Sequence, residues 1–143
     1  LLLGHAYMGL ARYEDASKAY FKAEYLGAKP EKVLRNLAWS LLMRRDFTRA
    51  RDYYEKAIIA TGALDVDFLN IGHIDWAEGH YQDALVSYRR NIEGRAKSAG
   101  VSLTEAAEQF IADIRSDSAD MQSIGIDVSL IPMVIDTILY SLE

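Results

Sequence analysis

The chain repeats a pattern of small, aromatic and aliphatic residues every 34 positions. The matching positions are Gly4, Ala38 and Gly72; Tyr13, Phe47 and Tyr81; Ala16, Ala50 and Ala84; Tyr20, Tyr54 and Tyr88; and Leu3, Leu37 and Ile71. A fixed period of this length is typical of proteins built from stacked supersecondary units, in which each unit buries its apolar face against the next. The period therefore constrains the fold more than any single motif does.

Each unit is predicted to form a pair of helices. Two stretches of the second unit carry apolar residues at helical spacing, namely Leu34, Leu37, Ala38 and Leu41, then Phe47, Ala50, Tyr54, Ala57 and Ile58. Residues that favour turns and helix ends separate the stretches. They are Arg45-Asp46 and Gly79-His80 within pairs, and Gly27, Pro30, Gly62 and Asp65 between pairs, with Asp65 expected as an N-cap. The small residues predict that the two helices of a pair cross closely, with positions 4, 38 and 72 facing the alanines at 16, 50 and 84.

This pattern resembles that of the tetratricopeptide repeat family. The family's small, aromatic and alanine positions are matched by Leu3-Gly4, Tyr7, Tyr13, Ala16, Tyr20 and Ala23; by Leu37-Ala38, Leu41, Phe47, Ala50, Tyr54 and Ala57; and by Ile71-Gly72, Tyr81, Ala84 and Tyr88. Leu41 and Asp75 depart from the family's Tyr, and Asn91 departs from its late Ala. The resemblance covers residues 1–98, with the first repeat truncated at its N-terminus. It implies an all-α, right-handed α-solenoid of three helix pairs, whose first helices line a concave groove.

Residues 99–143 are predicted to form an acidic helical cap. Gly100 ends a helix, and Ser102 with Glu105 forms a capping box that starts another. Ser129 is expected to cap a last helix that is apolar on two sides. A helix of this kind must be buried on both sides, so we expect a homodimer that forms through it. The alternative is that it folds into the groove as an internal ligand.

A second stripe on each first helix is the predicted binding site. It lies about 100° from the core stripe, and its residues are Leu1, His5 and Met8; Arg35, Trp39 and Leu42; and Leu69, His73 and Trp76, with Asn36 and Asn70 at the edge. Aromatic and Arg anchors beside amides suit a peptide or a partner helix. The predicted peptide-binding groove is therefore formed by His5, Met8, Arg35, Asn36, Trp39, Leu69, Asn70, His73 and Trp76.

Two functions follow from these features. The first is a non-catalytic scaffold that binds a peptide or protein partner in the groove. The second is a structural or self-association arm of a larger multi-repeat protein, in which the stripe packs neighbouring helices together. The chain begins inside a predicted helix without a Met, so we expect it to be part of a longer protein.

No catalytic, cofactor or metal site is predicted. His73 and His80 lie seven residues apart across a turn, and this spacing does not place two rings on one helix face for a metal. Asp75 replaces an aromatic or aliphatic residue and is expected to be a partly buried carboxylate bonded to a Tyr, an Arg or a helix terminus. The chain has no cysteine, and no nucleophile, paired carboxylates or phosphate loop converge. We therefore do not expect an enzyme.

Charge and hydropathy limit the partners. Residues 104–143 hold one basic and eight acidic residues, and no stretch elsewhere forms a concentrated basic face, so we expect no nucleic-acid partner. The most apolar stretch, residues 129–143, is too short to span a membrane and is interrupted by Pro132 and Asp136. No signal peptide is apparent, and a cytoplasmic location is favoured.

Overall fold

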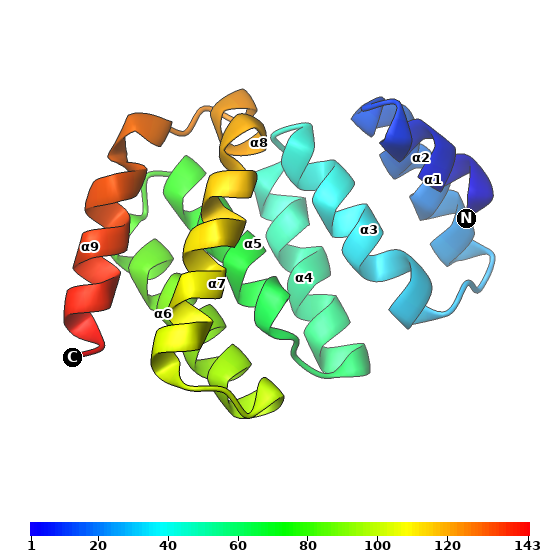
Figure 1. The fold of residues 1–143 in the computed structure, drawn as a ribbon. Coiled ribbons are helices and arrows are strands. Elements are labelled where there is room, and N and C mark those ends of the chain that lie inside the picture. The colour runs from blue at the N-terminus through cyan, green and yellow to red at the C-terminus, as the bar shows by residue number, and fades with distance from the viewer. The chain divides into compact units, whose positions relative to one another are not determined.

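A computed structural model describes all residues, 1–143, and contains helices but no strand. The α-helices are α1 (Leu2–Gly9), α2 (Tyr13–Tyr25), α3 (Pro30–Met43), α4 (Phe47–Thr61), α5 (Asp65–Ala77), α6 (Tyr81–Ala99), α7 (Leu103–Ser116), α8 (Ser118–Ser123) and α9 (Ile131–Ser141), and a 3-10 turn, η1 (Val128–Leu130), precedes α9 (Figure 1). The predicted all-α class is confirmed.

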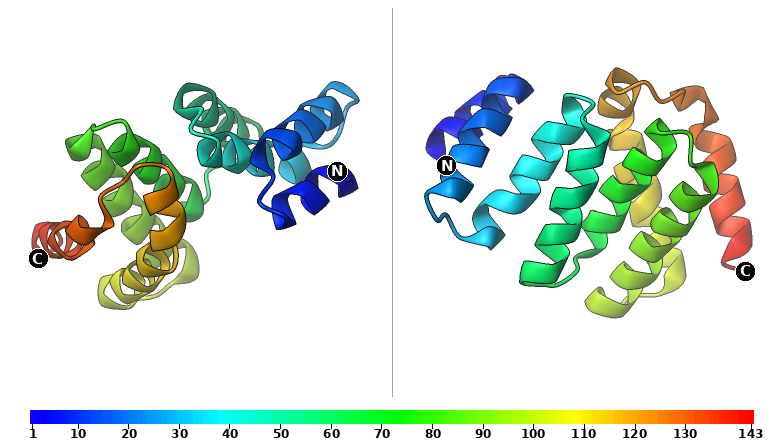
Figure 2. Two further views of the ribbon diagram at one scale, coloured as in Figure 1. Left: turned by 90° about the horizontal axis from the view of Figure 1, so that it is seen from above. Right: turned by 180° about the vertical axis from the view of Figure 1, so that it is seen from behind.

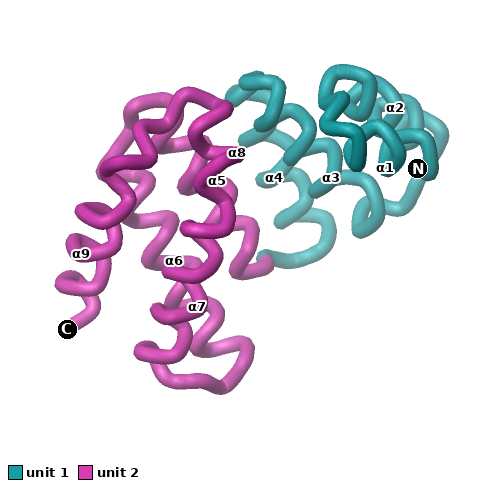
Figure 3. The backbone as a smooth tube through the Cα atoms, turned by 45° about the horizontal axis from the view of Figure 1, so that its top comes forward, with its two compact units in different colours: residues 1–63 teal, residues 64–143 magenta.

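Consecutive helices pack as the pairs α1/α2, α3/α4 and α5/α6, as the 34-residue period predicts. The chain divides into two compact units, residues 1–63 with α1–α4 and residues 64–143 with α5–α9 (Figure 3). Within the second unit α7 and α9 both pack against α6 and against each other (Figure 2). The C-terminal segment thus completes the core of the third pair.

On α1 and on α5 a tyrosine ring from the second helix of the pair packs so closely that only glycine fits. A Cβ atom added to Gly4 would lie 2.6 Å from Cε1 of Tyr20, and one added to Gly72 would overlap the ring of Tyr88. Both tyrosines are fully buried. The sequence prediction that these glycines face alanines therefore missed their closest partners, because a glycine in the first helix accommodates the flat face of a ring from the second.

Some helix caps are those predicted from the sequence, and others differ from the prediction. Pro30 starts α3 as predicted, and the Ser102 hydroxyl accepts the amide N–H of Glu105 at 3.1 Å, which is one of the two bonds of the predicted capping box. Asp65 is not the N-cap of α5. Leu64 takes that place, and its amide donates to the carboxylate of Asp67 at 2.9 Å.

The start of the last helix also differs from the prediction. Ser129 does not cap it, because Asp127 accepts both the amide and the hydroxyl of Ser129 and fixes the 3-10 turn η1 ahead of α9. The short helix α8 between α7 and η1 was not predicted. Six residues are too few for hydrophobic periodicity to reveal.

Candidate functional site

The predicted groove residues lie on the first helix of each pair: His5 and Met8 on α1; Arg35, Asn36 and Trp39 on α3; and Leu69, Asn70, His73 and Trp76 on α5. The first two sets belong to the first compact unit and the third set to the second unit.

In the first unit the predicted groove residues are exposed or partly exposed, although Leu42 of the same stripe is buried and several polar atoms have structural roles. Nδ1 of His5 lies 2.6 Å from the hydroxyl of Tyr20. Arg35 donates to the hydroxyl of Thr61 at 2.8 Å and to the carbonyl of Gly62 at 2.9 Å, so its guanidinium satisfies the C-terminal end of α4.

The remaining groove residues of this unit differ in their exposure and in their hydrogen bonds. The amide of Asn36 donates to the carbonyl of Lys32, one turn earlier in α3. Met8 and Trp39 are both partly exposed. Trp39 occupies the place that His5 and His73 hold in the other pairs. The indole nitrogen is only a donor, so Trp39 cannot accept a hydrogen bond from a tyrosine hydroxyl as a histidine ring nitrogen can.

In the second unit the same stripe is buried. Leu69, His73 and Trp76 are at most 4% exposed. Nε2 of His73 lies 2.9 Å from a carboxylate oxygen of Asp117, the residue between α7 and α8. The C-terminal segment therefore closes this part of the predicted groove, and only Asn70 remains partly exposed.

The bonds of His73 define its tautomer. A carboxylate only accepts, so Nε2 of His73 carries the hydrogen that is donated to Asp117. In the neutral ring Nδ1 is then an acceptor, and the hydroxyl of Tyr88 donates to it at 2.7 Å. Burial, followed by the charges of Asp117 and Asp75, raises the pKa of Tyr88 well above its ordinary value, so this hydroxyl keeps its proton.

Trp76 faces a cavity rather than a groove. Its ring lies edge-on to Tyr88, with 6.4 Å between the ring centroids. Trp76 lines a pocket of about 360 Å³ together with Leu130 of η1 and Met133 and Thr137 of α9. The aromatic residue predicted to anchor a peptide is therefore buried, and residues of the last helix line the same pocket.

Asp75 is buried, at 3% exposure, and its carboxylate accepts the hydroxyl of Ser87 at 3.0 Å. Sequence reasoning expected a burial of this kind but named a Tyr, an Arg or a helix terminus as the partner. The serine on α6 was not anticipated, because nothing in the linear pattern pairs it with position 75.

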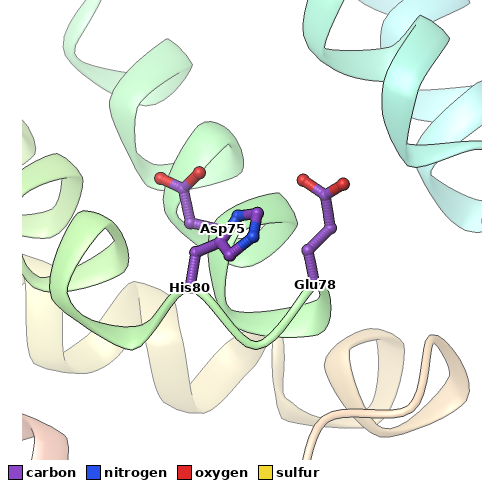
Figure 4. Close-up of side chains that lie close together, drawn as sticks. All are labelled: Asp75, Glu78 and His80. Carbon is purple, nitrogen blue, oxygen red and sulfur yellow. The ribbon is translucent and has the colours of Figure 1, made fainter.

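Three potential metal ligands converge at the turn between α5 and α6. Asp75, Glu78 and His80 each offer one donor atom, and these atoms lie within 4.8 Å of one another (Figure 4). His73 takes no part, because its ring is turned toward Tyr88 and Asp117. Sequence reasoning paired His80 with His73 and missed Glu78. The signal that could have found the cluster is the geometry of a helix C-terminal turn, which brings position 80 back to position 75, with Glu78 between them in the sequence.

No model of a known protein family matches the chain, and no curated protein is significantly similar to it in sequence. None of the helices combines the length and the apolar character that a membrane span requires.

Proposed function

We propose that the chain is a non-catalytic protein-interaction module of the tetratricopeptide repeat type, with its helix pairs arranged as a right-handed solenoid. Support comes from equivalent turns at the 34-residue spacing. Ala11, Arg45 and Gly79 have φ values of 55°, 64° and 82°, and each links the two helices of a pair. Two non-glycine residues in this conformation indicate that the turn is imposed by the packing of the pair.

The binding surface is the stripe of the first unit, and the carrying observation is the partly exposed indole of Trp39. Its counterpart in the second unit, His73, is buried, whereas Trp39 is partly exposed. Tryptophan and arginine are the residues most enriched among interface hot spots. Met8, a flexible side chain that adapts to different apolar partners, is also partly exposed on α1.

The ligand is a peptide or helix with an apolar anchor that packs against Trp39 and Met8. The second unit contributes little to this surface in our proposal, because Leu69, His73 and Trp76 are buried beneath other residues. The proposed site is therefore smaller than the nine-residue groove predicted from the sequence.

The test is selection of a random linear peptide library displayed on phage against the immobilised chain. The affinity of selected peptides is then measured by fluorescence anisotropy. Trp39→Ala is expected to weaken binding about 30-fold, the equivalent of a hot spot of about 2 kcal/mol. Tyr25→Ala is the control, because this aromatic side chain is 89% exposed on α2, outside the stripe, and its removal should leave affinity unchanged. Failure to enrich any peptide, or equal binding by Trp39→Ala and wild type, would contradict the proposal.

A structural or self-association role is the second candidate. It is favoured by exposed apolar residues at α1, where Leu2, Leu3 and Leu10 are all more than half exposed. The outer side of α9 carries Met133 and Tyr140, which are also exposed, while its inner side is buried. Large apolar side chains at a surface are typical of contacts with other proteins or with a second copy.

A further inference from the structure

The turn between α5 and α6 has a backbone geometry that holds its side chains in fixed positions. The amide of His80 donates to the carbonyl of Asp75 at 2.8 Å, and the amide of Gly79 donates to the carbonyl of Trp76 at 2.9 Å. With Gly79 at a φ of 82°, these two bonds form a Schellman motif. In this motif the residue after the glycine usually contacts the residue five positions earlier. Here those two residues are His80 and Asp75.

The same turn closes the other two helix pairs with different side chains. In the first pair the matching residues are Tyr7 and Arg12, and the guanidinium lies over the ring at 4.8 Å from its centroid. In the second pair they are Leu41 and Asp46, and Asp46 caps α4 instead. The third pair alone combines an imidazole and a carboxylate at these two places, with a second carboxylate from Glu78 between them.

We propose that Asp75, Glu78 and His80 bind a divalent transition-metal ion, with zinc as the best-matched metal. One imidazole nitrogen and two carboxylate oxygens form a donor set that zinc accepts, with a fourth position left for water or another donor. In Figure 4 the imidazole of His80 lies between the side chains of Asp75 and Glu78. This proposal departs from the sequence prediction of no metal site, which considered His80 only with His73.

The site needs only a small rearrangement. Two donors about 2.1 Å from a tetrahedral ion lie about 3.4 Å apart, and the three donor atoms here already lie within 4.8 Å. The remaining movement falls to His80, which is exposed. Its side chain is not held in a helix interior, because His80 precedes the first residue of α6.

Asp75 supplies the fixed ligand. It is buried, and the hydroxyl of Ser87 orients its carboxylate from α6. Hydrogen bonds of this kind to ligating carboxylates are a regular feature of metal sites and raise affinity by positioning the ligand. Calcium and magnesium prefer sets made only of oxygen ligands, so the imidazole favours zinc over both.

The experiment uses the full chain without an affinity tag, treated with EDTA and dialysed, then titrated with zinc chloride by isothermal titration calorimetry near neutral pH. The expected result is saturable binding of one zinc ion per chain and a higher melting temperature with zinc. His80→Ala and Glu78→Gln should each weaken binding by about tenfold or more, since each removes a ligand. The imidazole of His80 makes no capping hydrogen bond, so His80→Ala should fold normally, and circular dichroism in EDTA checks this.

Asp83→Asn is the matched control for Glu78→Gln, because it removes the same charge from an exposed residue on the first turn of α6, outside the cluster. It should keep wild-type affinity. The proposal is overturned if the wild-type chain shows no saturable zinc binding, or if His80→Ala and Glu78→Gln bind zinc as wild type does. It is also overturned if His5→Ala abolishes binding instead, or if calcium or magnesium binds as tightly as zinc.

Discussion

The hydroxyl of Tyr88 lies 2.7 Å from Nδ1 of His73, and in the first helix pair the hydroxyl of Tyr20 lies 2.6 Å from Nδ1 of His5. The two rings meet edge-on with centroids 5.5 Å apart in both pairs. The histidine and the tyrosine thus link the first and second helices of a pair. The two bonds differ in their surroundings, because His73 is also bonded to Asp117 and is buried, whereas His5 is exposed.

The contact between Gly72 and Tyr88 predicts that Gly72→Ala destabilises the protein. The added methyl group overlaps a buried ring, and overpacking of this kind costs about 1–3 kcal/mol. Gly94→Ala in α6 is the control, because its Cβ would lie 3.8 Å from the nearest atom and alanine is favoured over glycine in a helix by about 1 kcal/mol. Urea denaturation should therefore show a lower free energy of unfolding for Gly72→Ala and a higher one for Gly94→Ala. Equal stability of Gly72→Ala and wild type would mean that Tyr88 moves aside without cost.

The bond between His73 and Asp117 predicts that the C-terminal segment is fixed over α5 by a polar contact. Asp117→Ala leaves the buried imidazole without its acceptor, so we expect a loss of about 1–3 kcal/mol in the free energy of unfolding. Hydrogen exchange should also become faster in α7 and α8. Asp136→Ala removes an exposed carboxylate from α9 and serves as the control. The contact is unimportant for stability if the two variants unfold alike.

The raised pKa of Tyr88 predicts a loss of stability at high pH. In the unfolded chain this tyrosine ionises near its ordinary pKa of 10.0, whereas burial keeps the folded hydroxyl protonated. The contribution of Tyr88 to the free energy of unfolding is therefore complete below pH 10.0. It falls as the pH rises further, by about 1.4 kcal/mol per pH unit.

Tyr88→Phe isolates the pH effect. At neutral pH the variant should lose about 1 kcal/mol, because the hydrogen bond to His73 is gone. Above pH 10.0 its free energy of unfolding should fall less steeply than that of wild type. Parallel profiles for the two proteins would show that Tyr88 does not resist ionisation in the folded state.

The exposed side of α9 predicts a homodimer. Met133 and Tyr140 are 57% and 80% exposed, while Ile131, Ile135 and Ile138 fill the inner side of the same helix. Light scattering should give the mass of a dimer for wild type and of a monomer for Met133→Glu with Tyr140→Glu. A matched pair of substitutions on α2 and α4, Tyr25→Glu with Ile59→Glu, should leave the dimer intact, since these residues are even more exposed, at 89% and 87%, but lie outside α9. A monomeric wild type would rule out association through this helix.

The sequence by itself determined the six paired helices and which of them form pairs, but not the short helix α8. The 34-residue period fixes which helices form a pair, and local signals such as Pro30 and Ser102 fix where some of them begin, because capping and helical periodicity depend on residues only a few positions apart. Asp65 and Ser129 were misassigned as caps because neighbouring carboxylates, Asp67 and Asp127, accept the free amides there.

The tertiary structure decided which side chains are available at the surface. From the helical pattern alone His73 and Trp76 have the same position as His5 and Met8, but in the folded chain both are buried, and the contact of His73 with Asp117 comes from the C-terminal segment. The contact of His73 with Asp117 joins residues 44 positions apart, and no period in the sequence connects them. Periodicity specifies the face of a helix on which a residue lies, whereas the element that covers that face depends on how distant segments pack.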